Sequence, residues 1–248
     1  MTSKKIIFLT AITFIALILV CMNFFNFFRK SPEPIKTVAE PIKNTIEPYK
    51  DSSINLVYNL LFCDNLNLYK EKTVKPLSYP YDILFSDTIT VPELQKIIDD
   101  NSIESRIKLL AYNRQIISGH KPSKKELLAV IVEVGLDNGL DVLASFSDGT
   151  ARYINQTGKV LIWETTDKIS NELTKDLFNQ SQNIVNQIGI WNKPRKPHPT
   201  KGNVRITFLV SDGLYFGEGP INVLFSDPLA NPALTKATEL MKYLTEKS

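Results

Sequence analysis

Four short apolar stretches joined by tight turns, between residues 128 and 163, constrain the fold of this chain most strongly. The first stretch carries apolar side chains at alternate positions and is followed by the turn signal Asp137-Asn138-Gly139. Two further turn signals, Asp148-Gly149 and Thr157-Gly158, separate the later stretches. Because parallel neighbours need long crossover connections, tight turns predict an antiparallel meander. We expect its four strands at 128–134, 142–146, 152–154 and 160–163.

Helical periodicity flanks this meander. After it, apolar residues recur at spacings of four and seven, which predicts a helix with Asp167 as its N-cap and Gly189 as its stop. Further elements are expected on both sides: helices at 92–100, 103–118 and 232–246, and a strand pair at 204–211 and 214–225. The part from Asp51 to Ser248 is therefore expected to form an α+β domain, mainly antiparallel sheet with flanking helices.

One segment has a close echo 140 positions later. Residues 81–87 read YDILFSD and residues 221–227 read INVLFSD, and a proline follows each at the same distance. Residues 58–64, YNLLFCD, resemble the first part of the pattern. We interpret all three as apolar strands that end in turn-forming residues, with a proline-started helix after the first two. Either ordinary turn chemistry or a duplicated unit around the meander explains the echo.

An uncharged apolar segment lies near the N-terminus. Residues 6–28 contain no charged side chain, with lysines before them and Arg29-Lys30 behind. Such a helix would be about 34 Å long, enough to cross a hydrocarbon core of about 30 Å. The run is longer than that of a typical cleaved signal peptide and no small-residue cleavage site follows it. Residues 1–30 are therefore predicted to form a single N-terminal transmembrane anchor.

A proline-containing repeat follows this segment. The pattern Glu-Pro-x-Lys occurs three times with a period of seven within residues 31–50: at 33–36 and 40–43 with isoleucine in the third place, and at 47–50 with tyrosine. Regular prolines block a continuous helix, so this stretch is predicted to be an extended spacer of up to about 60 Å. Its composition resembles the Glu-Pro/Lys-Pro spacers of TonB-like envelope proteins, which cross a periplasm. We therefore expect the domain to be exported or periplasmic, although basic residues lie on both sides of the span.

Composition and motifs exclude several functional classes. A net charge of +3 on 248 residues is too small for an obligate nucleic-acid partner, so binding of nucleic acid is not expected. The sequence contains no Walker loop, dinucleotide fingerprint, paired-cysteine zinc spacing or helix-borne His-Glu pair. We therefore assign no cofactor, no metal ligand and no catalytic residue. Only Cys63 lies outside the apolar N-terminal segment, so no intramolecular disulfide is expected within the domain.

Basic residues gather in one proline-containing loop, residues 193–205, with a tryptophan just before it. Prolines limit the conformational entropy that a loop loses on binding, and the positive charge favours an anionic partner. Anionic lipid, phosphate or an acidic protein could bind there. The candidate contact surface consists of Trp191, Lys193, Arg195, Lys196, His198, Lys201 and Arg205.

Two functional hypotheses remain open, beside the possibility of a purely structural envelope protein without any single partner. The first is a single-pass membrane-anchored binding or assembly module, held to the membrane through residues 6–28 and contacting a protein or an anionic surface through the loop. The second is a membrane-anchored hydrolase in which His120 or His198 meets a carboxylate and a hydroxyl only in three dimensions. The absence of catalytic motifs favours the first, and the sequence indicates no oligomeric state.

Overall fold

The computed structural model describes residues 46–165 and 167–247, and all of them belong to one compact unit, Ile35–Ser248. The predicted anchor and the first part of the spacer lie outside the described residues. In the described part of the chain, no helix combines the length and the apolar character needed to cross a membrane.

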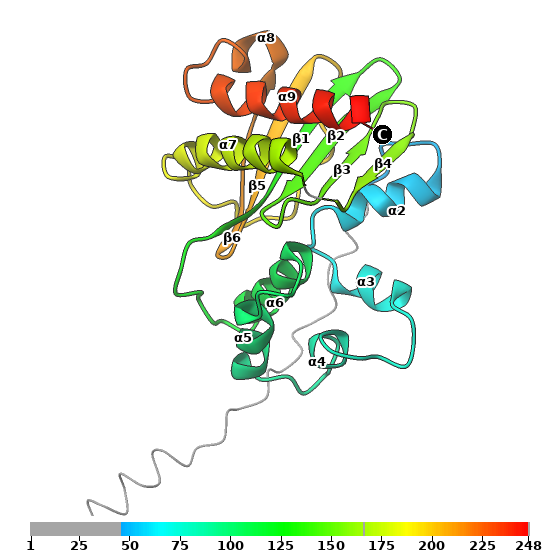
Figure 1. Cartoon of the computed structure of the whole chain (residues 1–248), viewed down its shortest axis with the longest axis vertical. Coiled ribbons are helices and arrows are strands. Elements are labelled where there is room, and N and C mark those ends of the chain that lie inside the picture. Colours follow the sequence, from blue (N-terminus) through cyan, green and yellow to red (C-terminus); the bar gives the residue numbers. More distant parts are fainter. Residues whose placement is uncertain (1–45, 166, 248) are drawn as a thin grey trace, which may run out of the picture. The chain divides into compact units, whose positions relative to one another are not determined.

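The centre of the domain is a single antiparallel sheet of six strands (Figure 1). Its order is β4-β3-β2-β1-β5-β6. The predicted meander is confirmed, because β1 to β4 pair in sequence order through the three predicted turns. The strands are β1 (Leu127–Leu136), β2 (Gly139–Phe146), β3 (Ala151–Ile154), β4 (Val160–Trp163), β5 (Asn203–Val210) and β6 (Gly213–Pro220).

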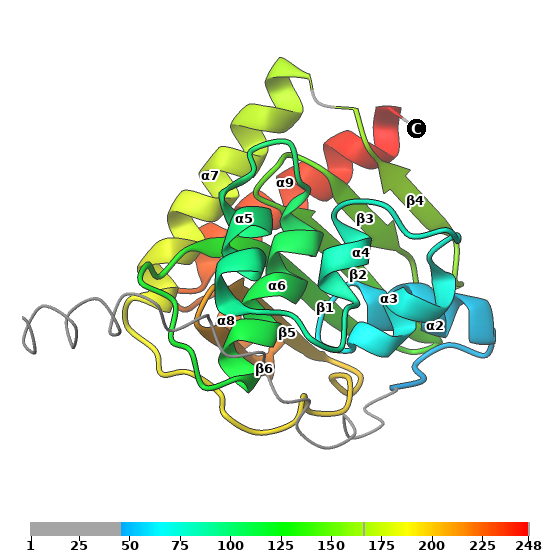
Figure 2. The same ribbon diagram turned by 90° about the horizontal axis from the view of Figure 1, so that it is seen from below.

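Helices cover both faces of the sheet, as expected for an α+β domain with flanking helices. Figure 2 looks through α5 and α6 onto the sheet, with α7 and α9 beyond it. On the near side lie α2 (Ser52–Leu60), α3 (Leu66–Lys72), α4 (Tyr81–Leu84), α5 (Val91–Asp99) and α6 (Ser105–Ile117). On the far side lie α7 (Lys168–Val185), α8 (Ile221–Leu224) and α9 (Asn231–Lys247).

Each face of the sheet has its own hydrophobic core. Ile131 of β1 belongs to the core formed with α2, α5 and α6, whereas its neighbours Val130 and Val132 belong to the core formed with α7 and α9. This division follows from the period of two along a strand, which sends successive side chains to opposite faces. A central strand between two helical layers is therefore apolar on both faces, with Glu133 as its charged exception.

Three predicted strands are wrong, because the segments form helices. The segments YDILFSD and INVLFSD contain the single-turn helices α4 and α8, and residues 58–64 include the end of α2. A short apolar run has the same composition in a buried strand and in a helical turn, so its period cannot separate them. The predicted strand 214–225 accordingly stops at Pro220, and the helix predicted to reach Gly189 ends at Val185, with Asn186 as its C-cap.

The echo between these segments nevertheless corresponds to equal local structure. Phe85 N–H donates to the carbonyl of Tyr81, and Phe225 N–H donates to that of Ile221, at the same offset of 140 positions. Helices α5 and α9 then begin at Val91 and Asn231, again 140 positions apart. In both places a helical turn is followed by a loop and a longer helix, and the two sets lie on opposite faces of the sheet.

The chain enters the domain along helix α2. The side-chain amide of Asn55 accepts a hydrogen bond from Tyr49 N–H (2.8 Å) and donates to its carbonyl (2.7 Å). Asn59, one turn later, binds both main-chain groups of Ile46 in the same way, at 3.1 and 2.8 Å. Tyr49 is buried, and its hydroxyl donates to the carbonyl of Leu140 in the sheet. The last residues of the predicted spacer are therefore packed into the fold.

Candidate functional site

The loop predicted to be a contact surface connects α7 to β5, and we call residues 190–202 the binding loop. It begins at the edge of the sheet, where Trp191 N–H donates to the carbonyl of Leu214 in β6 (2.7 Å). The indole of Trp191 packs edge-on against Phe216, with ring centroids 5.1 Å apart, and its Nε1–H donates to the carbonyl of Pro194. The start of the loop is thereby fixed to the outermost strand.

Arg195 attaches the middle of the binding loop to helix α2 and the residues after it. Its side chain is only 3% exposed, and its Nε donates to Asp64 (2.8 Å) while Nη2 donates to Asn59 (3.0 Å). The guanidinium lies 3.8 Å from the centre of the Phe62 ring, within the range of a cation–π contact. Arg195 therefore holds the loop from inside the protein.

Arg205 holds the next part of the loop from the sheet. Its side chain is 4% exposed; Nε and Nη2 donate to Glu218 of β6, at 3.0 and 2.8 Å. The same guanidinium donates to the carbonyls of Lys196 and Pro197. Main-chain carbonyls of the loop thus accept hydrogen bonds from a buried, fully charged group, which are among the stronger hydrogen bonds in proteins.

Glu133 lies beneath this arginine and is completely buried. Its Oε1 accepts a hydrogen bond from the hydroxyl of Tyr58 (2.7 Å), and its Oε2 lies 3.6 Å from Nη1 of Arg205. Burial raises the pKa of Glu133, and the charge of Arg205 opposes this effect. Helix α2, the central strand and the binding loop therefore meet in one buried cluster of charged and polar groups.

The lysines of the loop, in contrast, are exposed. The ammonium groups of Lys193 and Lys196 lie 5.6 and 5.5 Å from the Trp191 ring, and that of Lys196 lies 5.2 Å from the Phe216 ring. We call these four residues, Trp191, Lys193, Lys196 and Phe216, the cationic platform. Lys201, also exposed, is ion-paired with Asp137 in the turn between β1 and β2.

The end of the binding loop lines an open pocket with a volume of about 550 Å³. The β1–β2 turn, the β3–β4 turn and residues 48–51 form its other walls. His198, Asp137 and Thr200 all line it, but the histidine Nδ1 lies 3.2 Å from the carbonyl of Pro199, and no hydrogen bond to a carboxylate or hydroxyl is seen in the described part. The pocket has a mixed polar and apolar lining, and its described residues form no catalytic triad.

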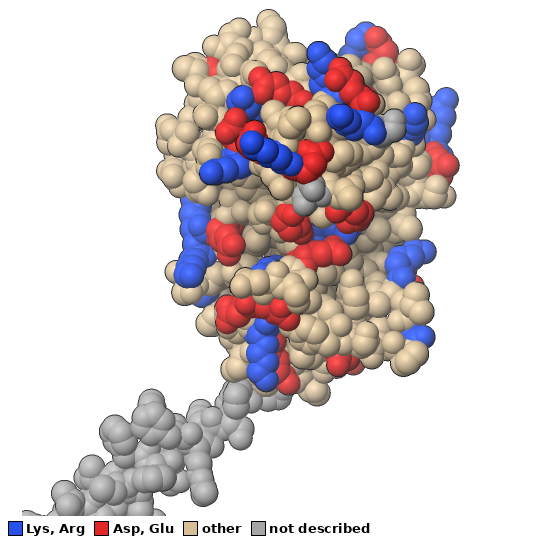
Figure 3. Space-filling view, viewed as in Figure 1, with Lys and Arg blue, Asp and Glu red and all other residues tan. Residues whose placement is uncertain are grey.

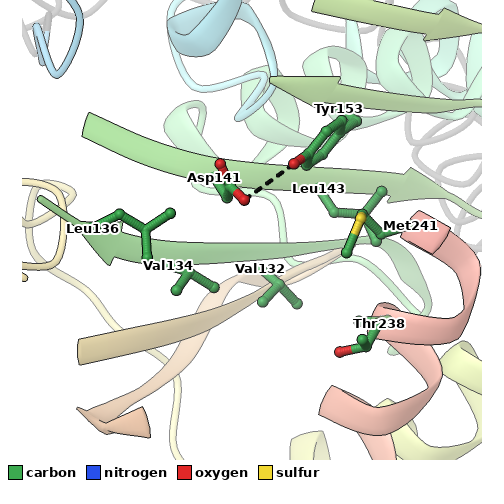
Figure 4. A pocket seen from close by; sticks show the side chains of 9 residues that line it. Val132, Val134, Leu136, Asp141, Leu143, Tyr153, Thr238 and Met241 are labelled. Carbon is green, nitrogen blue, oxygen red and sulfur yellow. Dashed lines mark hydrogen bonds between the residues drawn. The ribbon is translucent and has the colours of Figure 1, made fainter. Parts of the chain in front are cut away.

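A smaller pocket of about 120 Å³ lies between the sheet and α9 (Figure 4). Its walls are mostly apolar, with Val132, Leu143 and Met241 among them. Its one carboxylate, Asp141, accepts hydrogen bonds from the Tyr153 hydroxyl (3.0 Å) and from Gln156 N–H (2.7 Å). These bonds join β2 to β3 and to the β3–β4 turn.

The surface over α7 and α9 carries both signs of charge. Figure 3 shows acidic and basic side chains intermingled there. Lys236 of α9, for example, is ion-paired with Asp176 of α7 and with Glu239 of its own helix. This face therefore presents no continuous field of one sign to a partner. Over residues 46–165 and 167–247, no group of three or more potential metal-ligating side chains is found.

The seven predicted contact residues thus fall into three groups. Trp191, which is partly exposed, and the exposed Lys193 and Lys196 belong to the cationic platform, and His198 and Lys201 line the pocket of about 550 Å³. Arg195 and Arg205 point inward and are not available to a partner. Sequence reasoning missed the groups that bind these arginines, namely Asn59, Phe62, Asp64, Glu133 and Glu218. The charged residue within the apolar run of β1, Glu133, was the one signal that could have indicated a buried partner.

No family model, no curated protein and no solved structure matches this chain.

Proposed function

We propose that the protein is a single-pass membrane-anchored binding module that docks an acidic segment of a partner protein on its cationic platform. Two exposed ammonium groups beside two aromatic rings form a surface that favours carboxylate-bearing side chains. Tryptophan is among the side chains that most often dominate protein interfaces. The anchor at residues 6–28 and an exported or periplasmic domain belong to the proposal.

The observation that carries it is the fixation of the binding loop. Arg195 and Arg205 are buried and hold the loop through side-chain and main-chain contacts, so Trp191, Lys193 and Lys196 are presented on a rigid support. A preorganised loop loses less conformational entropy when a partner binds than a free loop does. Because the buried Arg195 and Arg205 cannot contact a partner, we infer that they support the loop surface that can.

The test is crosslinking in the native membrane. A photoreactive residue at the exposed position Asn192 is expected to form an adduct with a partner protein. The double substitution K193Q/K196Q is expected to reduce that adduct at least tenfold, roughly the loss of two charged contacts of ~0.7 kcal/mol or more each. The matched control K168Q/K175Q removes the same charge from exposed positions of α7 and is expected to leave the adduct unchanged.

Two outcomes would contradict the proposal. An equal loss in both double variants would mean that overall charge, not the platform, attracts the partner. Crosslinking to lipid alone, together with binding of the protein to anionic but not to zwitterionic vesicles, would mean that the surface docks on a membrane. Protease accessibility in intact and permeabilised cells tests the localisation separately, because the compartment decides which partners the platform can meet.

A second candidate, a membrane-anchored hydrolase, is favoured by one observation: His198, two carboxylates and threonine hydroxyls line the same pocket of about 550 Å³. Catalytic side chains can lie further apart without substrate than during the reaction, so the lack of a hydrogen bond between His198 and a carboxylate does not exclude catalysis. A screen of activated esters and amides with the wild-type chain and His198→Gln tests it. Turnover that the substitution abolishes would support a hydrolase, and equal background rates would contradict it.

A further inference from the structure

The two edges of the sheet are protected to different degrees. At the β6 edge, Trp191 pairs with Leu214, and Pro220 ends the strand without a main-chain donor. Gly217, Glu218 and Gly219 leave the second half of β6 without a large apolar side chain. Prolines, irregular pairing and short strands are the usual means by which proteins prevent edge-to-edge association. The opposite edge, β4, is short, with four residues, but none of them is a proline, a glycine or a charged residue.

The free main-chain groups of β4 belong to Val160 and Ile162. Asn155 N–H donates to the carbonyl of Lys159 (3.0 Å) at the β3–β4 turn. Hydrogen-bonded pairs alternate along an antiparallel ladder, so the pairs Tyr153–Leu161 and Ala151–Trp163 carry the bonds between these strands. The N–H and C=O groups of the two residues in between must therefore point away from β3. In the described part of the chain no further strand follows β4 in the sheet.

The side chains of β4 are apolar and incompletely buried on both faces. Ile162 is 61% exposed, on the face that carries α2 to α6, beside the buried side chain of Arg152. Val160, Leu161 and Trp163 are each partly exposed. Exposed Lys159 and Glu164 flank the strand at opposite ends. A strand with two free main-chain pairs and an exposed apolar side chain is a template for another strand of similar composition.

We propose that β4 is the interface at which two copies of this chain form a homodimer, with the two β4 strands antiparallel about a two-fold axis at Leu161. In this register Val160 of one copy lies opposite Ile162 of the other and exchanges both hydrogen bonds with it, and the symmetric pair does the same. Every outward main-chain group of β4 is then paired, and Ile162 is covered by an apolar side chain.

Charge also favours a second copy in this orientation. Antiparallel pairing brings the Lys159 end of each strand beside the end of the other at which Glu164, half-exposed, is ion-paired with Arg152, whereas parallel pairing would place the two Lys159 side chains together. The two six-stranded sheets would become one continuous sheet through the dimer. This interface uses no residue of the cationic platform, so it stands or falls independently of the proposed partner binding.

A disulfide tests the register directly. In the full chain with Cys21 replaced by serine, Leu161→Cys places two thiols opposite each other across the two-fold axis, at the close spacing of a pair without hydrogen bonds. Mild oxidation in detergent is expected to give a covalent dimer with Leu161→Cys. The control Ile190→Cys, at a position 49% exposed near the other edge, is expected to give none. Equal crosslinking of both variants, or of neither, would overturn the proposal.

A proline at position 162 tests the main-chain bonds. Because the Ile162 N–H points away from β3, Ile162→Pro removes donors from the dimer and none from the β3–β4 ladder. The dissociation constant, from analytical ultracentrifugation of the full chain, is expected to rise at least about tenfold. Ile162→Lys, which keeps the N–H but adds a charge to the buried pair, is a second variant in case the proline perturbs folding. Wild-type protein that is monomeric at every concentration, or dimers that both variants leave intact, would overturn the proposal.

Discussion

The hydroxyl of Tyr58 donates a 2.7 Å hydrogen bond to Oε1 of Glu133, and this bond joins helix α2 to the central strand of the sheet. Burial raises the pKa of Glu133 above the ordinary value of 4.5. The folded state therefore binds the proton of the Glu133 carboxyl group more tightly than the unfolded state does. The stabilisation that protonation provides is fully present below pH 4.5 and is lost as the pH rises through the higher, folded-state pKa.

The substitution Glu133→Gln is expected to remove this pH dependence, because glutamine keeps the shape of the side chain and does not titrate. The free energy of unfolding of the variant minus that of the wild type should increase as the pH rises above 4.5. Urea unfolding of the full chain in one detergent, over a series of pH values, measures it. A difference that is constant or falls with pH would show that the buried carboxylate is not the titrating group.

Arg205→Met is expected to destabilise the protein by about 3–5 kcal/mol, because it leaves two carboxylates, Glu133 and Glu218, without their buried cation. The matched control Lys193→Met removes an exposed charge and should change stability by no more than about 0.5 kcal/mol. Thermal or urea unfolding compares the two variants. Equal effects would mean that Arg205 is not the support of the binding loop.

Gly135→Ala is expected to displace the binding loop. A Cβ at position 135 would lie less than 3 Å from the carbonyl oxygens of Pro199 and Thr200, so main chain would have to move. A loss of about 1–3 kcal/mol follows from such overpacking. Gly189→Ala, where a Cβ would meet nothing within 4 Å, is the control and should be neutral within about 1 kcal/mol. Unfolding curves measure both losses, and a smaller effect at Gly135 would contradict the prediction.

The two asparagines of α2 should protect two different amide protons. Asn55→Ala is expected to speed hydrogen exchange at the Tyr49 amide, and Asn59→Ala at the Ile46 amide, because each substitution removes that proton's acceptor. A lost bond of about 1 kcal/mol corresponds to roughly fivefold faster exchange. Each variant serves as the control for the other. Uniform acceleration at both amides would mean that either substitution loosens the whole segment.

The sequence predicted the sheet better than the short helices for a physical reason. Asp137-Asn138-Gly139 and Asp148-Gly149 each specify a tight turn locally, so the pairing of β1, β2 and β3 follows from neighbouring residues alone. The segments at α4 and α8 carry apolar runs of a few residues, which suit a buried strand or one helical turn equally. The residues packed around each segment decide between a strand and a helical turn, and those residues are distant in the sequence.

For the candidate site, the sequence revealed the charged side chains of the loop but not which of them point into the protein. Arg195 binds Asp64, 131 positions away, and no local pattern links the two. Arg205 pairs with Glu218 across the β5–β6 hairpin, a contact that follows only once the register is known. The loop lysines remain exposed and Trp191 partly exposed, because they lie at the outer surface and not against α2 or the central strand. The arginines differ from the lysines not in charge but in being buried by residues that are distant in the sequence, and this burial makes them the support of the loop and not part of its surface.

The clamp of Asn59 on the incoming chain has a mechanical consequence. The same side-chain oxygen that accepts the Ile46 N–H also accepts a hydrogen bond from Nη2 of Arg195. A force that draws the N-terminal segment away from the domain therefore acts first on an amide shared with the binding loop, before it loads any strand of the sheet. Tension on the chain before Ile46 would therefore bear on an oxygen atom that Arg195 also uses, while the bond from its Nε to Asp64 would continue to hold the guanidinium.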